Sequence, residues 1–204
     1  ELDSCPYVSA EAKEKLSEAS APPIRPVAVG AGVRAFKIGG ETVMFRHEKT
    51  FYNPTGIAAL VTSDMDGGAL DRKLKEWNAF QYERVGLNLR PELVALKDVN
   101  GKAAAFAALA KKIAEQSEFN LVLMTDKADV MKAAVEVCAF KKPLLYAATA
   151  QNAEAMGKLA KEKGLPLAVK ADNLQNLIAL SDKLTAMGLK DLVLDSGARD
   201  PKQV

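Results

Sequence analysis

Six short apolar runs recur along this chain, and each ends in polar residues. The runs occupy residues 57–64, 93–98, 121–126, 144–149, 167–172 and 192–197. A continuous apolar run of this length is typical of a strand buried on both faces, as parallel strands are. The unit repeats at roughly 25 residues, about the length of a strand plus a crossover helix. The repeat therefore predicts an α/β fold with a parallel sheet.

The segments that follow the first five runs space their apolar residues as a helix does. We expect helices at residues 67–82, 102–116, 128–140, 152–163 and 173–187. Two architectures remain open at this point: an open six-stranded sheet, or six βα units of an eight-unit TIM barrel. The second treats the chain, which starts at Glu1 and stops after its sixth run, as part of a longer protein.

The segment before the first run lacks the strand–helix repeat. Residues 9–20 are polar and helix-like, and residues 21–26 (APPIRP) form a stiff linker, because each proline disfavours helix at the residue before it. Residues 27–47 alternate apolar and polar around Gly39 and Gly40, which predicts a β-hairpin. Such a hairpin would cover the bottom of a barrel.

Composition excludes several classes of protein. With 49% hydrophobic and 26% charged residues and a net charge of +2, the chain gives no sign of binding nucleic acid or an anionic membrane. No apolar run approaches the roughly 20 residues of a membrane helix, and no signal-peptide pattern opens the chain. Two distant cysteines make no disulfide framework. We expect a cytoplasmic protein.

Polar residues at the ends of the runs form the main constellation in the sequence. They are Ser63, Asp64, Lys97, Asp98, Thr125, Asp126, Thr149, Lys170 and Asp195. In a βα barrel these would crowd the carboxyl rim, where ligands bind. The plainer interpretation is that Asp and Thr cap the following helices, as Asn152 and Asp172 would, and that Lys pairs with them. A ring of carboxylates and lysines fits a small anionic ligand or a vestigial site.

Familiar catalytic motifs are missing, and the cysteines differ in character. The chain has no GxGxxG after a strand, no GxxxxGK[ST], no HExxH and no CxxC. Its one histidine, His47, is expected at a surface or interface. Cys138 has the apolar surroundings of a core residue. Cys5 precedes Pro6, as the last ligand of a bacterial iron–sulfur run does, but one cysteine cannot hold a cluster.

Four stretches of the chain resemble a known family. They are residues 1–8 (ELDSCPYV), 43–56 (VMFRHEKTFYNPTG), 61–68 (VTSDMDGG) and 73–86 (KLKEWNAFQYERVG). They are similar to the large (gamma) subunit of the corrinoid iron–sulfur protein and its counterpart in the archaeal acetyl-CoA decarbonylase/synthase complex. The resemblance runs over essentially the whole chain.

The resemblance implies three parts in the full protein: a 4Fe-4S domain, a TIM barrel and a corrinoid (cobalamin) domain. Cys5 matches the fourth cysteine of the cluster pattern, so residues 1–22 would end the 4Fe-4S domain and residues 23–204 would form an incomplete barrel. The corrinoid domain would follow Val204, and no residue here matches a corrinoid-binding motif.

In the family, cobalt takes a methyl group from methyltetrahydrofolate through a methyltransferase and passes it to acetyl-CoA synthase. The implied partners are those two proteins and a small subunit that is itself a barrel. The barrel of this chain would be a scaffold and docking surface. Two alternatives remain open: a freestanding βα-barrel enzyme for a small anionic substrate, using Lys97 or Lys170 with Asp64 or Asp195, and a pure interaction module.

Overall fold

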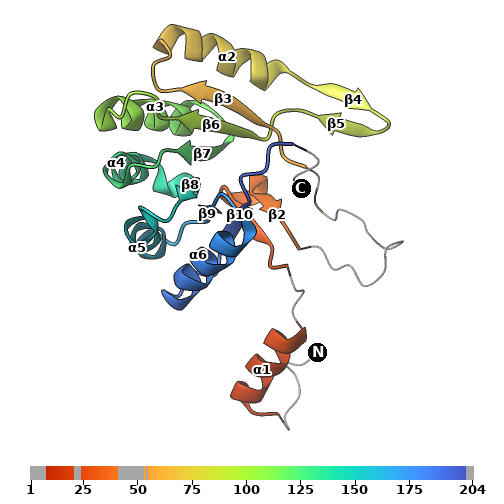
Figure 1. Ribbon diagram of the computed structural model, residues 1–204. Helices are drawn as coiled ribbons and strands as arrows, with labels where there is room; N and C mark the ends of the chain where they lie inside the picture. The colour runs from red at the N-terminus through yellow and green to blue at the C-terminus, as the bar shows by residue number, and fades with distance from the viewer. Residues whose placement is uncertain (1–7, 21–23, 41–52, 54, 201–204) are drawn as a thin grey trace.

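The computed structural model describes residues 8–20, 24–40, 53 and 55–200. Its centre is a parallel sheet whose strand order is the order of the strands along the chain (Figure 1). Every neighbouring pair of strands is parallel. The strands are β3 (Ala58–Thr62), β6 (Leu93–Lys97), β7 (Asn120–Met124), β8 (Leu144–Ala148), β9 (Leu167–Lys170) and β10 (Leu192–Asp195). The strands expected from the six apolar runs are confirmed.

Helices connect successive strands of the sheet. They are α2 (Gly67–Ala79), α3 (Ala103–Gln116), α4 (Ala128–Cys138), α5 (Ala153–Lys163) and α6 (Leu174–Ala186). Each connection steps to the next strand in the same direction, so right-handed crossovers place all of these helices on one face. Figure 1 shows this helical layer beside the sheet. The α/β class is confirmed, and the arrangement is compatible with part of a barrel.

Side chains cap α2 and α6, whereas α3, α4 and α5 have no side-chain cap. Asp66 caps α2, since its carboxylate accepts from the backbone amides of Gly68 and Ala69. The cap of α6 is Asn173 rather than the expected Asp172, because the Asn173 side chain accepts from the amide of Asn176 at 2.8 Å.

Asn152 occupies the expected N-cap position of α5, but its side chain makes no capping bond to that helix. The side chain instead accepts from the Thr149 amide and donates to the carbonyl of Asp126. It therefore joins the loops after β7 and β8. Among the described residues, the backbone amides of Ala150 and Gln151, in the loop before α5, have no hydrogen-bond partner.

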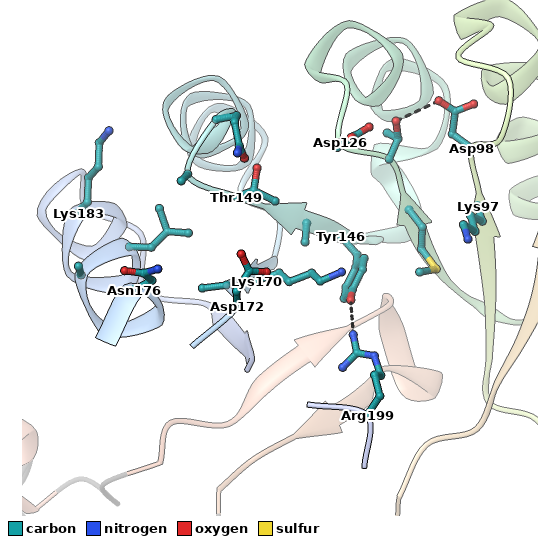
Figure 2. A pocket seen from close by; sticks show the side chains of 18 residues that line it. Lys97, Asp98, Asp126, Tyr146, Thr149, Lys170, Asp172, Asn176, Lys183 and Arg199 are labelled. Atoms are coloured by element: carbon teal, nitrogen blue, oxygen red, sulfur yellow. Dashed lines mark hydrogen bonds between the residues drawn. The ribbon is translucent and has the colours of Figure 1, made fainter. Parts of the chain in front are cut away.

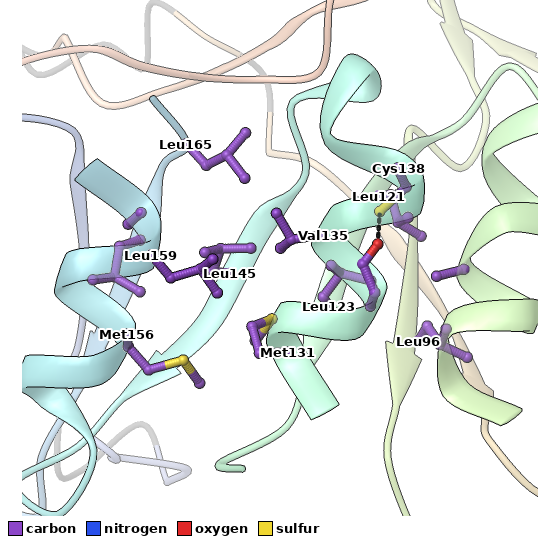
Figure 3. Close-up of a cluster of buried hydrophobic side chains, with 14 of the residues drawn as sticks. Leu96, Leu121, Leu123, Met131, Val135, Cys138, Leu145, Met156, Leu159 and Leu165 are labelled. Carbon is purple, nitrogen blue, oxygen red and sulfur yellow. Dashed lines mark hydrogen bonds between the residues drawn. The ribbon is translucent and has the colours of Figure 1, made fainter. Parts of the chain in front are cut away.

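The main core lies between the helices and the face of the sheet that they cover. Leu96, Leu123 and Leu145 point from the strands toward Met131 and Met156 of α4 and α5 (Figure 3), and all five side chains are fully buried. Full burial of an aliphatic side chain of this size contributes about 1.5–3 kcal/mol. This layer fixes the sheet and hence the position of the strand ends.

A β-hairpin covers part of the opposite face of the sheet. It consists of β1 (Val27–Val29) and β2 (Phe36–Ile38), joined through a short 3-10 turn, η2 (Gly32–Arg34). Val29 packs with Leu93 and Val122 in a second apolar cluster. The Asn120 side chain donates to the carbonyl of Arg34 at 2.8 Å. The hairpin thus fills the amino-terminal part of this face and leaves the carboxyl part open.

The expected position of the hairpin turn is wrong. The chain reverses between Val29 and Phe36, where Gly30 and Gly32 have φ of +98° and +68°. Gly39 and Gly40 also have positive φ, but they follow β2 and lead the chain away from the pair. The expected second strand at residues 41–47 lies outside the described residues.

A second hairpin was not expected from the sequence. Strands β4 (Tyr82–Arg84) and β5 (Leu87–Leu89) follow α2, which ends at Ala79 rather than at residue 82. This ribbon extends from the sheet beside the start of β6 (Figure 1).

Helix α1 (Ala10–Ser20) stands apart at the amino-terminal end of the described chain (Figure 1). The Ser9 hydroxyl accepts from the amide of Ala12, which caps the helix that was expected at residues 9–20. Of the helices that the structure describes, none has both the length and the apolar character needed to cross a lipid bilayer.

Candidate binding site at the carboxyl edge of the sheet

A cavity of about 940 Å³ opens at the carboxyl edge of the sheet, on the face that the first hairpin leaves open (Figure 2). The strand register places Lys97 beside Met124 and Met124 beside Tyr146. Lys170 lies beside Asp195 on the next pair of strands. Side chains alternate between the two faces of a strand, so these residues form one row that points away from the helices.

Parallel pairing brings the expected strand-end residues to one edge, and most of them line this cavity. Those that line it are Lys97, Asp98, Thr125, Asp126, Thr149 and Lys170. Ser63, Asp64 and Asp195 lie at the same edge but not in the cavity lining. The clustering predicted from the sequence is therefore confirmed for six of the nine residues.

Asp98 organises the loops that follow β3, β6 and β7. Its carboxylate accepts from the Gly101 amide at 2.8 Å and from the Thr125 hydroxyl at 3.1 Å. The buried Ser63 hydroxyl accepts from the amide of Val99 at 3.0 Å. These bonds satisfy backbone and hydroxyl groups that would otherwise be left unpaired. Asp98 and Thr125 thus have structural roles in the loops, but the expectation that they cap the following helices is wrong, because the N-cap positions of α3 and α4 are Lys102 and Lys127 and neither helix has a side-chain cap.

Tyr146, Asp195 and Arg199 form a network that the sequence did not reveal. The Tyr146 hydroxyl donates to Asp195. Arg199 donates to both carboxylate oxygens of Asp195, at 3.0 and 2.9 Å, and to the Tyr146 oxygen at 3.3 Å (Figure 2). Such a bidentate contact is the geometry in which Arg recognises carboxylates best. The network holds the segment after β10 against β8.

This network shifts the acidity of its members in opposite directions. The Arg199 hydrogen bonds hold the pKa of Asp195 far below its usual range, against the opposing effect of burial. Burial, reinforced by the bond to Asp195, raises the pKa of Tyr146 to about 12. The carboxylate is therefore charged and the phenol neutral near neutral pH, so neither is poised for proton transfer there.

Tyr146 gave only a weak signal in the sequence, since it is the one hydroxyl-bearing side chain within the apolar run 144–148. Arg199 gave none, because it lies in a loop beyond the last run. Its role depends on the turn at Gly197, where φ is +74° and an added Cβ would lie 2.8 Å from the Ala171 carbonyl oxygen.

Lys97 and Lys170 are the cations of the open face. Figure 2 shows the Lys170 side chain extending from β9 toward Tyr146. Among the described residues, no hydrogen bond or ion pair involves the side chain of either lysine. The pairs that an enzyme mechanism would need, either lysine with Asp64 or Asp195, are not formed, because Asp195 is engaged by Arg199 and Asp64 lies outside the cavity.

Within the part of the chain that the structure describes, no three His, Cys, Asp or Glu side chains gather to hold a metal ion. Cys138 is fully buried in α4 and its thiol donates to the Ala134 carbonyl, while burial raises its pKa to about 12. Its expected role in the core is confirmed. Cys5 and His47 lie outside the described residues.

Curated proteins similar to this chain share one set of names. The corrinoid/iron-sulfur protein large subunit of Moorella thermoacetica is 46% identical over 98% of this chain and 45% of its own length. The acetyl-CoA decarbonylase/synthase complex subunit gamma 2 of Methanosarcina mazei is 38% identical over 95% of this chain and 42% of its own length. The gamma subunit of Methanothermobacter thermautotrophicus is 33% identical over 96% of this chain.

The chain thus spans less than half the length of these relatives. A family description matches residues 26–201, which include the hairpin, the whole parallel sheet and the cavity. On this match the chain belongs to the CO dehydrogenase/acetyl-CoA synthase delta subunit family.

Proposed function

We propose that this chain is part of a corrinoid iron–sulfur methyl carrier, in which cobalt accepts a methyl group from methyltetrahydrofolate and delivers it to acetyl-CoA synthase. The observation that carries the proposal is the 46% identity, over 98% of this chain, with a protein named as a corrinoid/iron-sulfur large subunit. The cofactors supply the difficult chemistry in such a protein, and the polypeptide positions them.

In this proposal the described segment is a scaffold and docking domain. Its rim side chains support that role, because Asp98 and Asp195 are taken up by structural hydrogen bonds rather than left free for acid–base chemistry. The described residues show no donor set suited to cobalt or to an iron–sulfur cluster. The proposal therefore gives this segment no direct part in the chemistry at either cofactor.

We further propose that the sheet is six-eighths of a TIM barrel spanning residues 23–204. Sequential strand order, helices on one face and a hairpin over the other support this geometry. Both edge strands present exposed leucines: Leu60 on β3 is 53% exposed, and Leu194 on β10 is 58% exposed. Two further βα units would cover such residues and close the ring.

Residues 1–22 are proposed to end a 4Fe-4S domain, with Cys5 as the fourth ligand of the cluster. The corrinoid domain is proposed to lie beyond Val204. The proposed partners are a small subunit, a methyltetrahydrofolate methyltransferase and acetyl-CoA synthase. The names of the curated relatives support the corrinoid, the iron–sulfur cluster and membership of a larger complex.

The cluster assignment is tested by two cysteine variants of the intact protein. Cys5→Ala should abolish the brown absorption and most of the bound iron, since a 4Fe-4S cluster is held by four thiolates. Cys138→Ala is the matched control, because its buried thiol donates to Ala134 and is remote from any cluster ligand role. Iron content unchanged in the Cys5 variant would contradict the assignment.

The carrier role is tested by single-turnover methyl transfer. The intact protein is reduced and mixed with methyltetrahydrofolate and the methyltransferase, and the cobalt absorption bands are followed. Loss of the reduced-cobalt band with stoichiometric methylation is expected. An intact protein that contains no corrinoid would overturn the proposal.

A further inference from the structure

The rim cavity contains two lysines whose charge the described chain does not neutralise. Lys97 comes from β6 and Lys170 from β9, and both lie on the open face of the sheet. Neither side chain has a hydrogen bond or ion pair among the residues that the structure describes. Lys170 is partly buried, so its charge is only partly screened by water. A cation held in this way attracts an anion.

The other charges around the cavity are either engaged already or screened by solvent. Arg199 is paired with Asp195, and Asp98 accepts from Gly101 and Thr125. Lys183 is exposed on α6, so solvent screens its charge. The remaining acids of the lining, Asp126 and Asp172, are exposed, as Lys97 is, so solvent screens all three charges. The partly buried Lys170 is therefore the least screened unpaired charge of the cavity.

The start of helix α5 adds hydrogen-bond donors beside Lys170. Thr149, Ala150 and Gln151 line the cavity, and α5 begins without a side-chain capping bond. Within the described residues, the Thr149 hydroxyl and the amides of Ala150 and Gln151 have no hydrogen-bond partner. These two amides lie in the loop just before Asn152, the N-cap residue of α5, and free backbone amides near the positive end of a helix dipole bind phosphate and similar anions.

The size and floor of the cavity indicate more than a bare anion. A volume of about 940 Å³ accommodates an organic molecule, and Met124, Ala147 and Leu180 supply apolar lining. We propose that this cavity binds a small phosphorylated molecule, with its phosphate held by Lys170 and the loop amides of Ala150 and Gln151 and with Lys97 as a second cation. The proposal does not depend on the methyl-carrier role.

Titration of the intact protein with inorganic phosphate tests the site, with phosphorus NMR or calorimetry as the readout. Saturable binding is expected, and Lys170→Met should weaken it by about tenfold or more, because hydrogen bonds from charged donors are the strong ones. Lys97→Met should weaken it less, and Lys170→Arg should keep most of it. Lys132→Met is the matched control, since Lys132 is exposed on α4 and lies outside the lining.

Each outcome of this titration is decisive. If the variants unfold at the same midpoint temperature as the parent protein, a loss of phosphate binding is not caused by a loss of folding. Acetate at matched ionic strength separates phosphate from carboxylate recognition, and equal competition by acetate would overturn the phosphate assignment. No saturable binding, or unchanged binding in Lys170→Met, would overturn the site itself. The titration needs neither cobalt nor methyl transfer, so its failure is distinct from failure of the carrier role.

Discussion

At the scale of single residues, Asp195 is the group on which the edge of the sheet depends most. Its side chain is 19% exposed and takes hydrogen bonds from Tyr146 on β8 and from Arg199 beyond β10. Removing its charge leaves a guanidinium and a phenol without their acceptor. The charge therefore ties together two strands that are not direct neighbours in the sheet.

Asp195→Asn should lower the free energy of unfolding by about 1–2 kcal/mol at pH 7, since hydrogen bonds to charged groups contribute about 1.5–3 kcal/mol and solvent screens part of this at the exposed Arg199. The folded pKa of Asp195 is lowered, so its stabilisation is present above the unfolded pKa of about 3.9 and is lost as pH falls toward the folded value. The difference between variant and parent should therefore shrink between pH 7 and pH 3, as measured by urea unfolding.

Asp191→Asn serves as the control for this prediction. Asp191 pairs with Arg25 at 3.1 Å, but both side chains are about half exposed. Exposed pairs contribute at most about 1 kcal/mol, so the control should be near neutral at both pH values. Equal losses in the free energy of unfolding for the two substitutions at pH 7 would show that the Asp195 network stabilises the fold no more than an exposed ion pair does.

At the scale of elements, the first hairpin is held to the sheet by a close approach of backbone to side chain. Gly30 donates its amide to the Lys142 carbonyl at 2.9 Å, and a Cβ on Gly30 would lie 1.8 Å from the Asn120 side-chain oxygen. Asn120 is itself buried and donates to Arg34 in the same hairpin. The contact requires a residue without a side chain.

Gly30→Ala should destabilise the fold by about 2–3 kcal/mol, since it combines a strained positive φ with a clash against a buried side chain. Gly32→Ala, the matched control, also has positive φ but meets nothing within 4 Å of the added Cβ. It should cost only about 1 kcal/mol. Urea unfolding midpoints compare the two, and equal losses would show that backbone strain alone sets the cost.

Elements with a long apolar signal were predictable from the sequence, and short exposed ones were not. The four central strands are mostly buried, so each has a continuous apolar run, and the partly exposed edge strands β3 and β10 carry the same kind of run. Strands β4 and β5 have only three residues each, and Tyr82 is 55% exposed, so no periodic pattern marks them. The turn at Gly39 was misjudged because two nearby glycine pairs offered equally good turn chemistry.

Some residues of the candidate site were predictable from the sequence and others were not. Strand-end residues such as Lys97 and Lys170 were predictable, because parallel strands end at one edge. The contact between Tyr146 and Arg199 was not, because it spans 53 residues and depends on the path of the chain after β10. The cap of α6 was predicted to within one position, as the shift from Asp172 to Asn173 shows, whereas α3, α4 and α5 have no side-chain cap where one was expected.

At the scale of the whole molecule, the sheet has two unpaired edges within the described residues, β3 and β10. Unpaired strands promote association between copies. Under the proposed barrel, this chain on its own should self-associate, and light scattering after size exclusion should show mass above that of a monomer. The expectation follows from Leu60 and Leu194, which expose more than half of their surface at these edges.

The double substitution Leu60→Lys with Leu194→Lys should shift this chain toward the monomer, because charge on an edge strand opposes pairing between copies. Phe140→Lys is the matched control: Phe140 is 61% exposed, but it lies in the 3-10 turn η4 (Ala139–Lys141), just before the central strand β8. It should leave the association unchanged. A parent chain that is already a stable monomer at high concentration would contradict an incomplete ring, and would favour an open sheet whose edges tolerate water.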